Sequence, residues 1–251
     1  MKRYLLKNKY SIIAMVGMVF LWEILSIYID NVVIFPRIKE FYYSLKGIIL
    51  DTKFINIVFN TVKILFLSLG VSIFLGITAS FLAIRYEMFQ HLFKNFFNLL
   101  RSTPSVIIIV LVIVWSSIKI VPLIVAITIG TPLFYDNILG GIDSIDKNII
   151  SMAKIYKVSK IDILKKIYIP GVYFFISSLL GGIISLIFKV VIASEILSQK
   201  DNTIGGEIFL NKVYLDIGKI FGWVAIIIVI NLVINKILNI FNKKITKWRK
   251  I

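Results

Sequence analysis

The sequence contains no cysteine and only one histidine, His91. Without thiols the chain can form neither a disulfide framework nor a thiolate metal site. Because the chain has one histidine and no cysteine, zinc or haem sites built on several His or Cys ligands are excluded as well. His91 lies between Arg85 and Lys94, and we interpret it as a solvated residue at a membrane interface. We therefore expect no metal site and no cofactor.

The common motifs of catalysis are also missing. No segment matches the phosphate-binding pattern G-x-x-x-x-G-K-[ST], and its nearest piece, Gly218-Lys219, is followed by Ile220. A Ser-His or Cys-His pair for nucleophilic catalysis has little support in a chain with one histidine and no cysteine. We therefore predict that the chain is not an enzyme and does not itself hydrolyse ATP.

Long apolar runs are what the sequence has in abundance. Hydrophobic residues make up 59% of its 251 positions, whereas soluble domains average about 45–50%. A helix needs roughly 20 mostly apolar residues to cross a bilayer. The sequence therefore predicts an all-α, polytopic membrane protein with about six transmembrane helices in a single domain, 1–251. The predicted spans are 11–29, 57–84, 98–117, 120–139, 172–194 and 218–240.

The stretch 98–139 leaves two interpretations open. Lys119 and Pro122 interrupt a nearly continuous apolar sequence, which favours two spans joined by a tight turn. The alternative is one long, tilted or kinked helix, which would make the number of spans odd.

The net charge of +16 indicates an orientation in the membrane. With the N-terminus inside, the cytoplasmic segments, Arg101 among them, carry more than twice as many lysines and arginines as the outer ones. Cytoplasmic loops are enriched in these residues. We therefore expect a multi-pass protein of the cell membrane with both termini in the cytoplasm.

Two stretches predict helix faces. Within the outer loop 30–56, apolar residues at helical spacing predict a short amphipathic helix at the outer interface. In the second span, small residues recur every four positions and predict a buried face where another helix approaches closely. These small residues are Ser68, Ser72, Gly76 and Ser80.

The segment 151–170, "SMAKIYKVSKIDILKKIYIP", is too rich in lysine to lie in lipid. Asp143 and Asp146 can cap a helix over 147–157. Ser159 followed by Asp162 matches a capping box, which predicts a second helix. Pro170 should end the element, because it lacks a backbone donor and disfavours helix before it. The residues alone allow either a docking element or a solvated connection.

A few ionisable residues fall inside predicted spans, where they are costly and usually face a protein interior or a wet cavity. Lys189 lies in the fifth span, Glu195 at its outer end and Glu23 in the first span. Lys189 could line a translocation path and attract an anion, or it could form a structural ion pair with Glu23 or Glu195 of this chain or of a partner subunit. We do not expect a direct pair of Lys189 with Glu195 of the same helix, because residues six positions apart do not share a helix face well.

The stretch 140–171, "GGIDSIDKNIISMAKIYKVSKIDILKKIYIPG", resembles the cytoplasmic EAA loop of ABC-importer permeases. Ser151, Met152 and Ala153 occupy the Glu-Ala-Ala positions, so that only Ala153 matches. Lys157 stands where that family usually has glycine, and Ile169-Pro170 matches its Leu-Pro.

Other segments resemble the nitrate/sulfonate/taurine-type permeases in the same order along nearly the whole chain. They are Trp22-Glu23, Phe35-Pro36, "LLRSTPSVIIIVLVIVW" (99–115), "VVIASEILS" (190–198), "TIGGEI" (203–208) and "YLDIGKIFGW" (214–223).

The resemblance implies that the loop docks on a cytoplasmic ATP-binding-cassette ATPase dimer. Met152, Ala153 and Tyr156 would make the contact and Ile169 and Pro170 would fix the loop's exit. This chain has Ser151 where the family has glutamate and Lys157 where it has glycine. Both departures affect the expected strength of the contact with the ATPase.

The resemblance also implies a function. Two identical chains would form a path for a small solute, delivered by a separate extracellular or periplasmic binding protein. Lys189 favours an anion, such as a sulfonate, nitrate or a thiamine precursor. An ion-gradient-driven secondary transporter is the alternative, and a membrane scaffold without transport is a third possibility.

Overall fold

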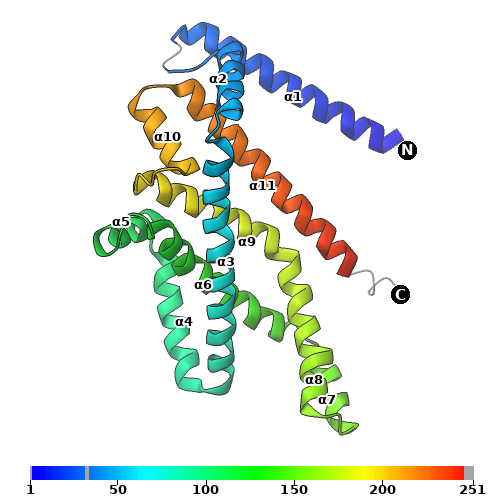
Figure 1. Cartoon of the computed structure of the whole chain (residues 1–251). Helices are drawn as coiled ribbons and strands as arrows, with labels where there is room; N and C mark the ends of the chain where they lie inside the picture. The colour runs from blue at the N-terminus through cyan, green and yellow to red at the C-terminus, as the bar shows by residue number, and fades with distance from the viewer. Residues whose placement is uncertain (1, 32–33, 246–251) are drawn as a thin grey trace.

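The computed structural model describes residues 2–31 and 34–245, and it leaves out the side chains of 2–9, 11, 12, 15 and 243–245. Every regular element in this part of the chain is helical, which confirms the all-α prediction (Figure 1). The helices are α1 (Lys2–Ile29), α2 (Ile38–Leu50), α3 (Phe54–Arg85), α4 (Glu87–Ser102), α5 (Ser105–Trp115), α6 (Val121–Asp143), α7 (Lys147–Ile155), α8 (Lys160–Ile163), the π-helical turn η1 (Leu164–Tyr168), α9 (Ile169–Leu197), α10 (Ile204–Val213) and α11 (Ile217–Ile245).

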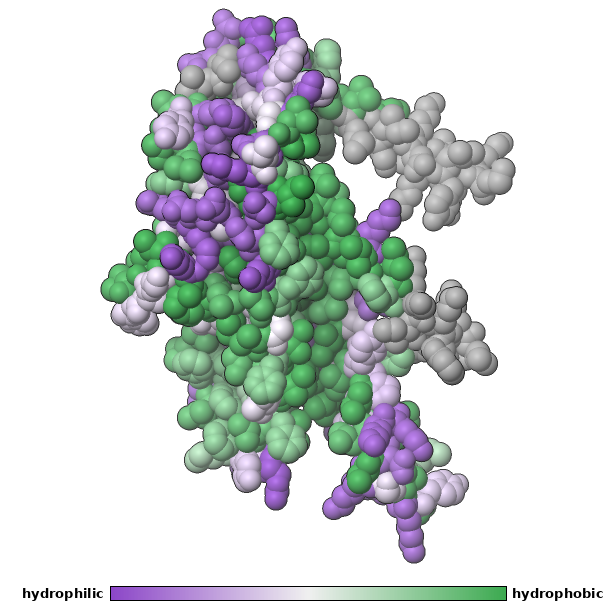
Figure 2. Space-filling model, in the orientation of Figure 1, coloured by the Kyte–Doolittle hydropathy of each residue, from purple (hydrophilic) through white to green (hydrophobic). Residues whose placement is uncertain are grey.

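Four helical stretches are long and apolar enough to cross a membrane. They are Phe54–Arg85, Val121–Asp143, Lys160–Leu197 and Ile217–Asn242. They contain the predicted spans 57–84, 172–194 and 218–240, and they contain 120–139 except for Ile120. Hydrophobic residues cover much of the surface between a hydrophilic upper part and the hydrophilic tip formed by α7 and α8 (Figure 2). The chain is therefore a polytopic membrane protein.

The single long helix considered for 98–139 is wrong, because α5 ends at Trp115 and α6 begins at Val121. The predicted span 98–117 is not one straight helix, and it counts as a span only together with the bend between α4 and α5. This stretch is divided between α4 and α5, whose axes differ by 101°. Thr103 is extended (φ −79°, ψ 126°), because the ring of Pro104 disfavours helix in the residue before it. Helix α5 has 11 residues, about 17 Å at 1.5 Å per residue, which is too short to cross a bilayer alone.

The number of spans also differs from the predicted six. In the described residues there are four spans, or five if the bent pair α4–α5 counts as one. Helix α1 has 28 residues and covers the predicted first span 11–29. Its apolar segment within the described side chains is Val16–Ile29, so the span prediction for 11–29 stays a prediction.

The core is formed by α3, α6 and α9. The predicted small-residue face of α3 is confirmed, because Ser68, Ser72, Gly76 and Ser80 are all buried. A Cβ atom on Gly76 would lie 2.7 Å from the Cβ of Phe134, so only glycine allows α6 this close. Larger apolar side chains complete the core, among them Leu65, Ile187 and Phe188.

Pro170 does not end a helix, contrary to the prediction. The helix continues from Lys160 to Leu197, and Pro170 lies in the first turn of α9. Just before it, residues Leu164–Tyr168 form a π-helical turn. A proline removes one backbone donor and crowds the preceding turn, and such local widening is a known way to accommodate the change.

The predicted amphipathic helix is α2, which packs its Ile48 against α11 near Gly222. The connection before α2 is held by Trp22 of α1, whose indole Nε1 donates to the Pro36 carbonyl at 3.0 Å. The Trp22 ring also lies against Phe35 and Phe221, with centroids 5.0 Å away in each case. These contacts tie the end of α1 to the upper part of the molecule.

Candidate functional site

The first candidate site is the pair of short helices α7 and α8 at the lower tip of the molecule (Figure 1). Asp146 accepts a hydrogen bond from Asn148 N at 2.8 Å and caps α7. Ser159 accepts one from Asp162 N at 3.1 Å and caps α8. Each cap satisfies a backbone donor that the helix leaves unpaired. The two predicted capped helices are confirmed, although α7 ends at Ile155 rather than at 157.

Lys157 closes α7 in a left-handed conformation, with φ 51°. Val158 N donates to Ala153 O at 2.9 Å and Lys157 N donates to Lys154 O at 3.0 Å. These two bonds form a Schellman motif, whose left-handed position is most often glycine. Lysine therefore occupies this left-handed position with some strain.

The C-terminal end of α7, including its C-cap residue Tyr156, exposes large apolar side chains. Met152 is 56% exposed, and Ile155 and Tyr156 are each 77% exposed. Ser151 is also exposed, whereas Ala153 is half-buried. Sequence analysis missed Ile155, although Met152, Ile155 and Tyr156 have the i, i+3, i+4 spacing of one helix face. Exposed apolar side chains on a polar tip indicate a contact surface.

Ile169 and Pro170 lie at the base of this tip. Pro170 lines a groove of about 840 Å³ between the start of α7 and the lower part of α9. The groove also includes Ile149 and Phe174. Ile169 is 56% exposed, outside the groove's lining. Both residues therefore belong to a continuous helix that carries the tip.

The second candidate site is a polar seam between the spans α9 and α11. Asn235 Nδ2 donates to Ser185 Oγ at 3.1 Å, and Ser185 Oγ lies 2.9 Å from Asn231 Oδ1. A Cβ atom on Gly181 would lie 2.6 Å from Asn235 Oδ1, so this glycine makes room for the amide. Hydrogen bonds of this kind hold membrane helices together, because lipid offers the groups no partner.

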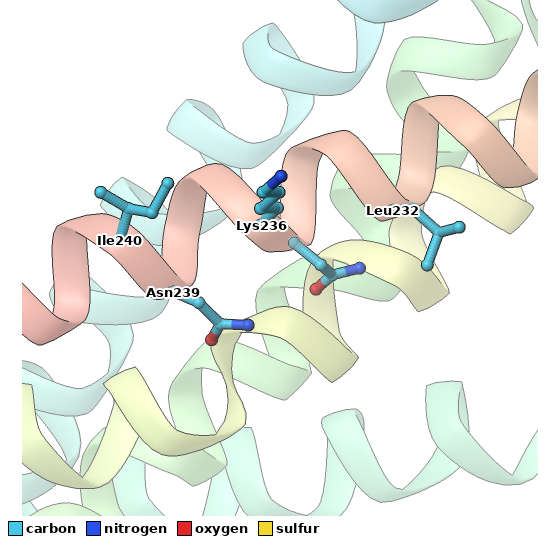
Figure 3. Close-up of a pocket in the computed structure, with 5 residues that line it drawn as sticks. Leu232, Lys236, Asn239 and Ile240 are labelled. Atoms are coloured by element: carbon cyan, nitrogen blue, oxygen red, sulfur yellow. The ribbon is translucent and has the colours of Figure 1, made fainter. Parts of the chain in front are cut away.

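A groove of about 530 Å³ opens beside this seam (Figure 3). Its lining residues on α11 are Leu232, Asn235, Lys236, Asn239 and Ile240. Lys189 lies one helical turn beyond Ser185 on α9, and both Lys189 and Lys236 are exposed. Among the side chains that the structure describes, neither lysine forms an ion pair. The side of the molecule with this seam therefore combines amides, hydroxyls and two cations.

The asparagines of α11 were missed by sequence analysis. Their spacing of four, four and three residues marks one face of a membrane helix, which is a recognisable signal. They are Asn231, Asn235, Asn239 and Asn242.

Glu195 lies away from this seam and is completely buried. Its Oε2 accepts hydrogen bonds from Thr61 Oγ1 and from Gly205 N, each at 3.0 Å. Its other oxygen has no hydrogen-bond partner in the described part of the chain. The nearby Lys200 follows the span, and burial lowers the pKa of its ammonium group while the charge of Glu195 opposes this shift.

Glu23 has a local partner as well. Its Oε2 accepts a hydrogen bond from Ile38 N at 3.3 Å, at the start of α2. The positive end of the α2 helix dipole stabilises a carboxylate at this place. Neither Glu23 nor Glu195 pairs with Lys189, and a role for either carboxylate in a path stays a prediction.

A further charged pair joins the bent helices to α6. Arg101 Nη1 pairs with a carboxylate oxygen of Asp136. The charge count assigned Arg101 to a cytoplasmic segment, but it lies 14 residues beyond the start of α4. That is about 21 Å along the helix axis from the α3–α4 turn.

Comparisons with known proteins point to one family. The sequence model of the family described as "Binding-protein-dependent transport system inner membrane component" matches residues 72–250. No curated protein matches the chain. Among solved structures, a chain described as "Crystal structure of an amino acid ABC transporter with histidines" is similar in fold, with a TM-score of 0.67. It has 15% sequence identity, and the match covers 76% of this chain and 94% of that one.

Proposed function

The chain belongs to the family of binding-protein-dependent transport system inner membrane components, and we propose that it is the permease subunit of an ATP-binding-cassette importer of the nitrate/sulfonate/taurine type. A cytoplasmic ATPase dimer docks on α7, and a separate binding protein delivers the solute to the opposite side. Two copies of the chain form the path, with both termini in the cytoplasm of a cell-membrane protein. The similar fold of an amino acid ABC transporter supports this assignment.

The observation that carries the proposal is the exposed apolar face of α7. Met152, Ile155 and Tyr156 lie at the end of a helix that is capped at both ends. This helix is followed by the continuous helical stretch from α8 into α9. A tip of this construction transmits force, because its backbone is held by its own hydrogen bonds. A segment that only connected two spans would have no reason to expose these apolar side chains to water.

The polar seam supports a path for a small anionic solute. Lys236 lines the groove together with Asn235 and Asn239. Lys189 is exposed on α9, one helical turn beyond Ser185, which hydrogen-bonds to the asparagines of α11. Exposure of this polar surface to lipid would be energetically unfavourable. The cost is avoided if the surface faces a water-filled path between two copies of the chain.

A pair of matched tyrosines tests the docking site. Tyr156 and Tyr214 are both 77% exposed, the first at the α7 tip and the second between α10 and α11. We expect Tyr156→Ala to reduce the ATPase that co-purifies with the tagged chain by about tenfold or more, because buried aromatic anchors dominate interface affinity. Tyr214→Ala should leave the yield unchanged.

The ATPase is recognised in the co-purified material by mass spectrometry, from a sequence that contains the phosphate-binding motif. An undiminished yield with Tyr156→Ala would exclude α7 as the docking site. A chain that retains no ATPase even without substitution, in lipid nanodiscs, would count against the importer proposal itself.

A further inference from the structure

The Arg101–Asp136 pair joins the two sides of an unusual break. Helix α4 runs beside α3 from their shared turn at the lower end (Figure 1), and the chain then bends by 101° into α5. Below the break, α4 is held by apolar packing: Phe97 is buried against Tyr135 of α6, with ring centroids 4.9 Å apart. At the break, α4 contacts α6 through an ion pair rather than through aromatic rings, because Arg101 lies in the last turn of α4.

The guanidinium of Arg101 is engaged on several sides. Its Nε donates to the Phe97 carbonyl at 3.3 Å, its Nη2 donates to Asn98 Oδ1, and its Nη1 pairs with Asp136. A cation in the last turn of a helix also offsets the negative end of the helix dipole. Arg101 therefore stabilises the end of α4 and attaches it to α6 at the same time.

The pair is not sealed in the protein core. The side chain of Arg101 is 38% exposed and that of Asp136 is 34% exposed. At about 21 Å along α4 from the α3–α4 turn, at 1.5 Å per residue, both groups lie within the depth of the membrane spans. Charges at such depth face a protein interior or water rather than lipid.

The short helix α5 depends on this attachment for its direction. Only Thr103 and Pro104 separate it from α4, and both are extended. Its buried face packs Ile109 and Val112 against α6 and against Val190, the neighbour of Lys189 on α9. The direction of α5 thus decides what covers Val190 of α9.

We propose that the Arg101–Asp136 ion pair is a latch that fixes the angle of α5 and so keeps this short helix packed against Val190 of α9. Arg101 and Asp136 are positioning residues: they need not contact the solute, and they act through α5. The statement that α5 lines the path rests on the proposed transport function. The angle of α5 is independent of that function, and it can be measured separately.

The absence of cysteine makes a direct measurement possible. Spin labels are attached to Thr78→Cys on α3 and Val114→Cys on α5, both at exposed positions. The distance between the labels is recorded by pulsed electron paramagnetic resonance on the full chain in lipid nanodiscs. A control pair uses Thr78→Cys and Lys94→Cys, because α4 at Lys94 lies below the break.

With the ion pair intact, we expect one narrow distance for each label pair. Arg101→Gln and Asp136→Asn should each lower the ratio of native to displaced α5 positions by about fivefold, the upper range for exposed ion pairs. The α3–α4 distance should not change, since aromatic packing holds α4. The exchanged pair, Arg101→Asp with Asp136→Arg, should restore most of the native distance.

Two results would overturn the proposal. One is an unchanged α3–α5 distance in both single variants. The other is a loss of the α3–α4 distance together with the α3–α5 distance, which would show that the pair merely stabilises the whole helix packing. Failure of the ATPase to bind would affect neither distance, so this experiment is independent of the proposed function.

Discussion

The hydroxyl group of Thr61 donates a hydrogen bond to Glu195 Oε2 at 3.0 Å, across 134 residues of sequence. The same hydroxyl accepts a hydrogen bond from Ile204 N at 3.0 Å, and Glu195 Oε2 accepts another from Gly205 N. The first two backbone donors of α10 are therefore satisfied by α3 and α9. This small network, rather than a sequence-local cap alone, holds α10 against the ends of two spans.

Replacing Thr61 with valine should destabilise the protein. The substitution keeps the shape but leaves Ile204 N without its acceptor and removes one donor from Glu195. At about 1–3 kcal/mol for each buried group that loses its partner, we expect a loss of about 2–4 kcal/mol in the free energy of unfolding. The measurement is a denaturant titration of the purified chain in detergent.

Thr78→Val is the matched control for this substitution. The Thr78 hydroxyl is exposed and donates only to Phe74 O of its own helix. We expect a change below about 0.5 kcal/mol, as at most surface sites. Equal losses in the two variants would contradict a special role for the Thr61–Glu195 contact.

Gly205 should not tolerate a side chain. A Cβ atom there would lie 2.4 Å from the Cβ of Glu195 and 2.8 Å from Ile192 O. We expect Gly205→Ala to lower the free energy of unfolding by about 1–3 kcal/mol through overpacking. Gly70→Ala has open space around it and should be neutral or stabilise by up to about 1 kcal/mol, since alanine favours helix. If Gly205→Ala proved as stable as Gly70→Ala, α10 could not lie this close to α9.

Replacing Lys157 with glycine should stabilise the end of α7. Lysine pays a steric cost at φ 51°, whereas glycine does not, although glycine gains entropy in the unfolded chain. The net effect should be about 0.5–1 kcal/mol. Slower hydrogen exchange of the α7 backbone amides in Lys157→Gly would show that the helix end is more stable. Lys154→Gly, three residues earlier in the helix, should instead accelerate the exchange, and the same effect from both variants would contradict the Schellman geometry.

Lys189 should face water in the assembled protein. In the cysteine-free chain, we expect Lys189→Cys to react with a charged, water-soluble thiol reagent about tenfold faster than Phe74→Cys, because a charged reagent enters lipid poorly. Phe74 is 68% exposed on α3 and serves as the lipid-facing control. Labelling is performed on the full chain in membranes. Equal, slow labelling at both positions would leave Lys189 with no part in a path.

Much of the architecture follows from the sequence by itself. Four of the predicted spans are present because long apolar stretches have only helices available to them in lipid. The caps at Asp146 and Ser159 were predictable as well, since a cap is a contact between residues two or three positions apart. The small-residue face of α3 could be recognised for the same reason: helical periodicity is a local property.

Tertiary structure decided the features that depend on distant partners. Pro104 bends the chain while Pro170 does not interrupt a helix, because the π-helical turn before Pro170 and the packing of α9 absorb the second proline. Arg101 was predicted only as a cytoplasmic charge, and its partner Asp136 lies 35 positions further along the chain. The partners of Glu195 Oε2 on α3 and α10 were likewise not predictable. Which groups a side chain meets across the fold is set by packing geometry, and no sequence period encodes it.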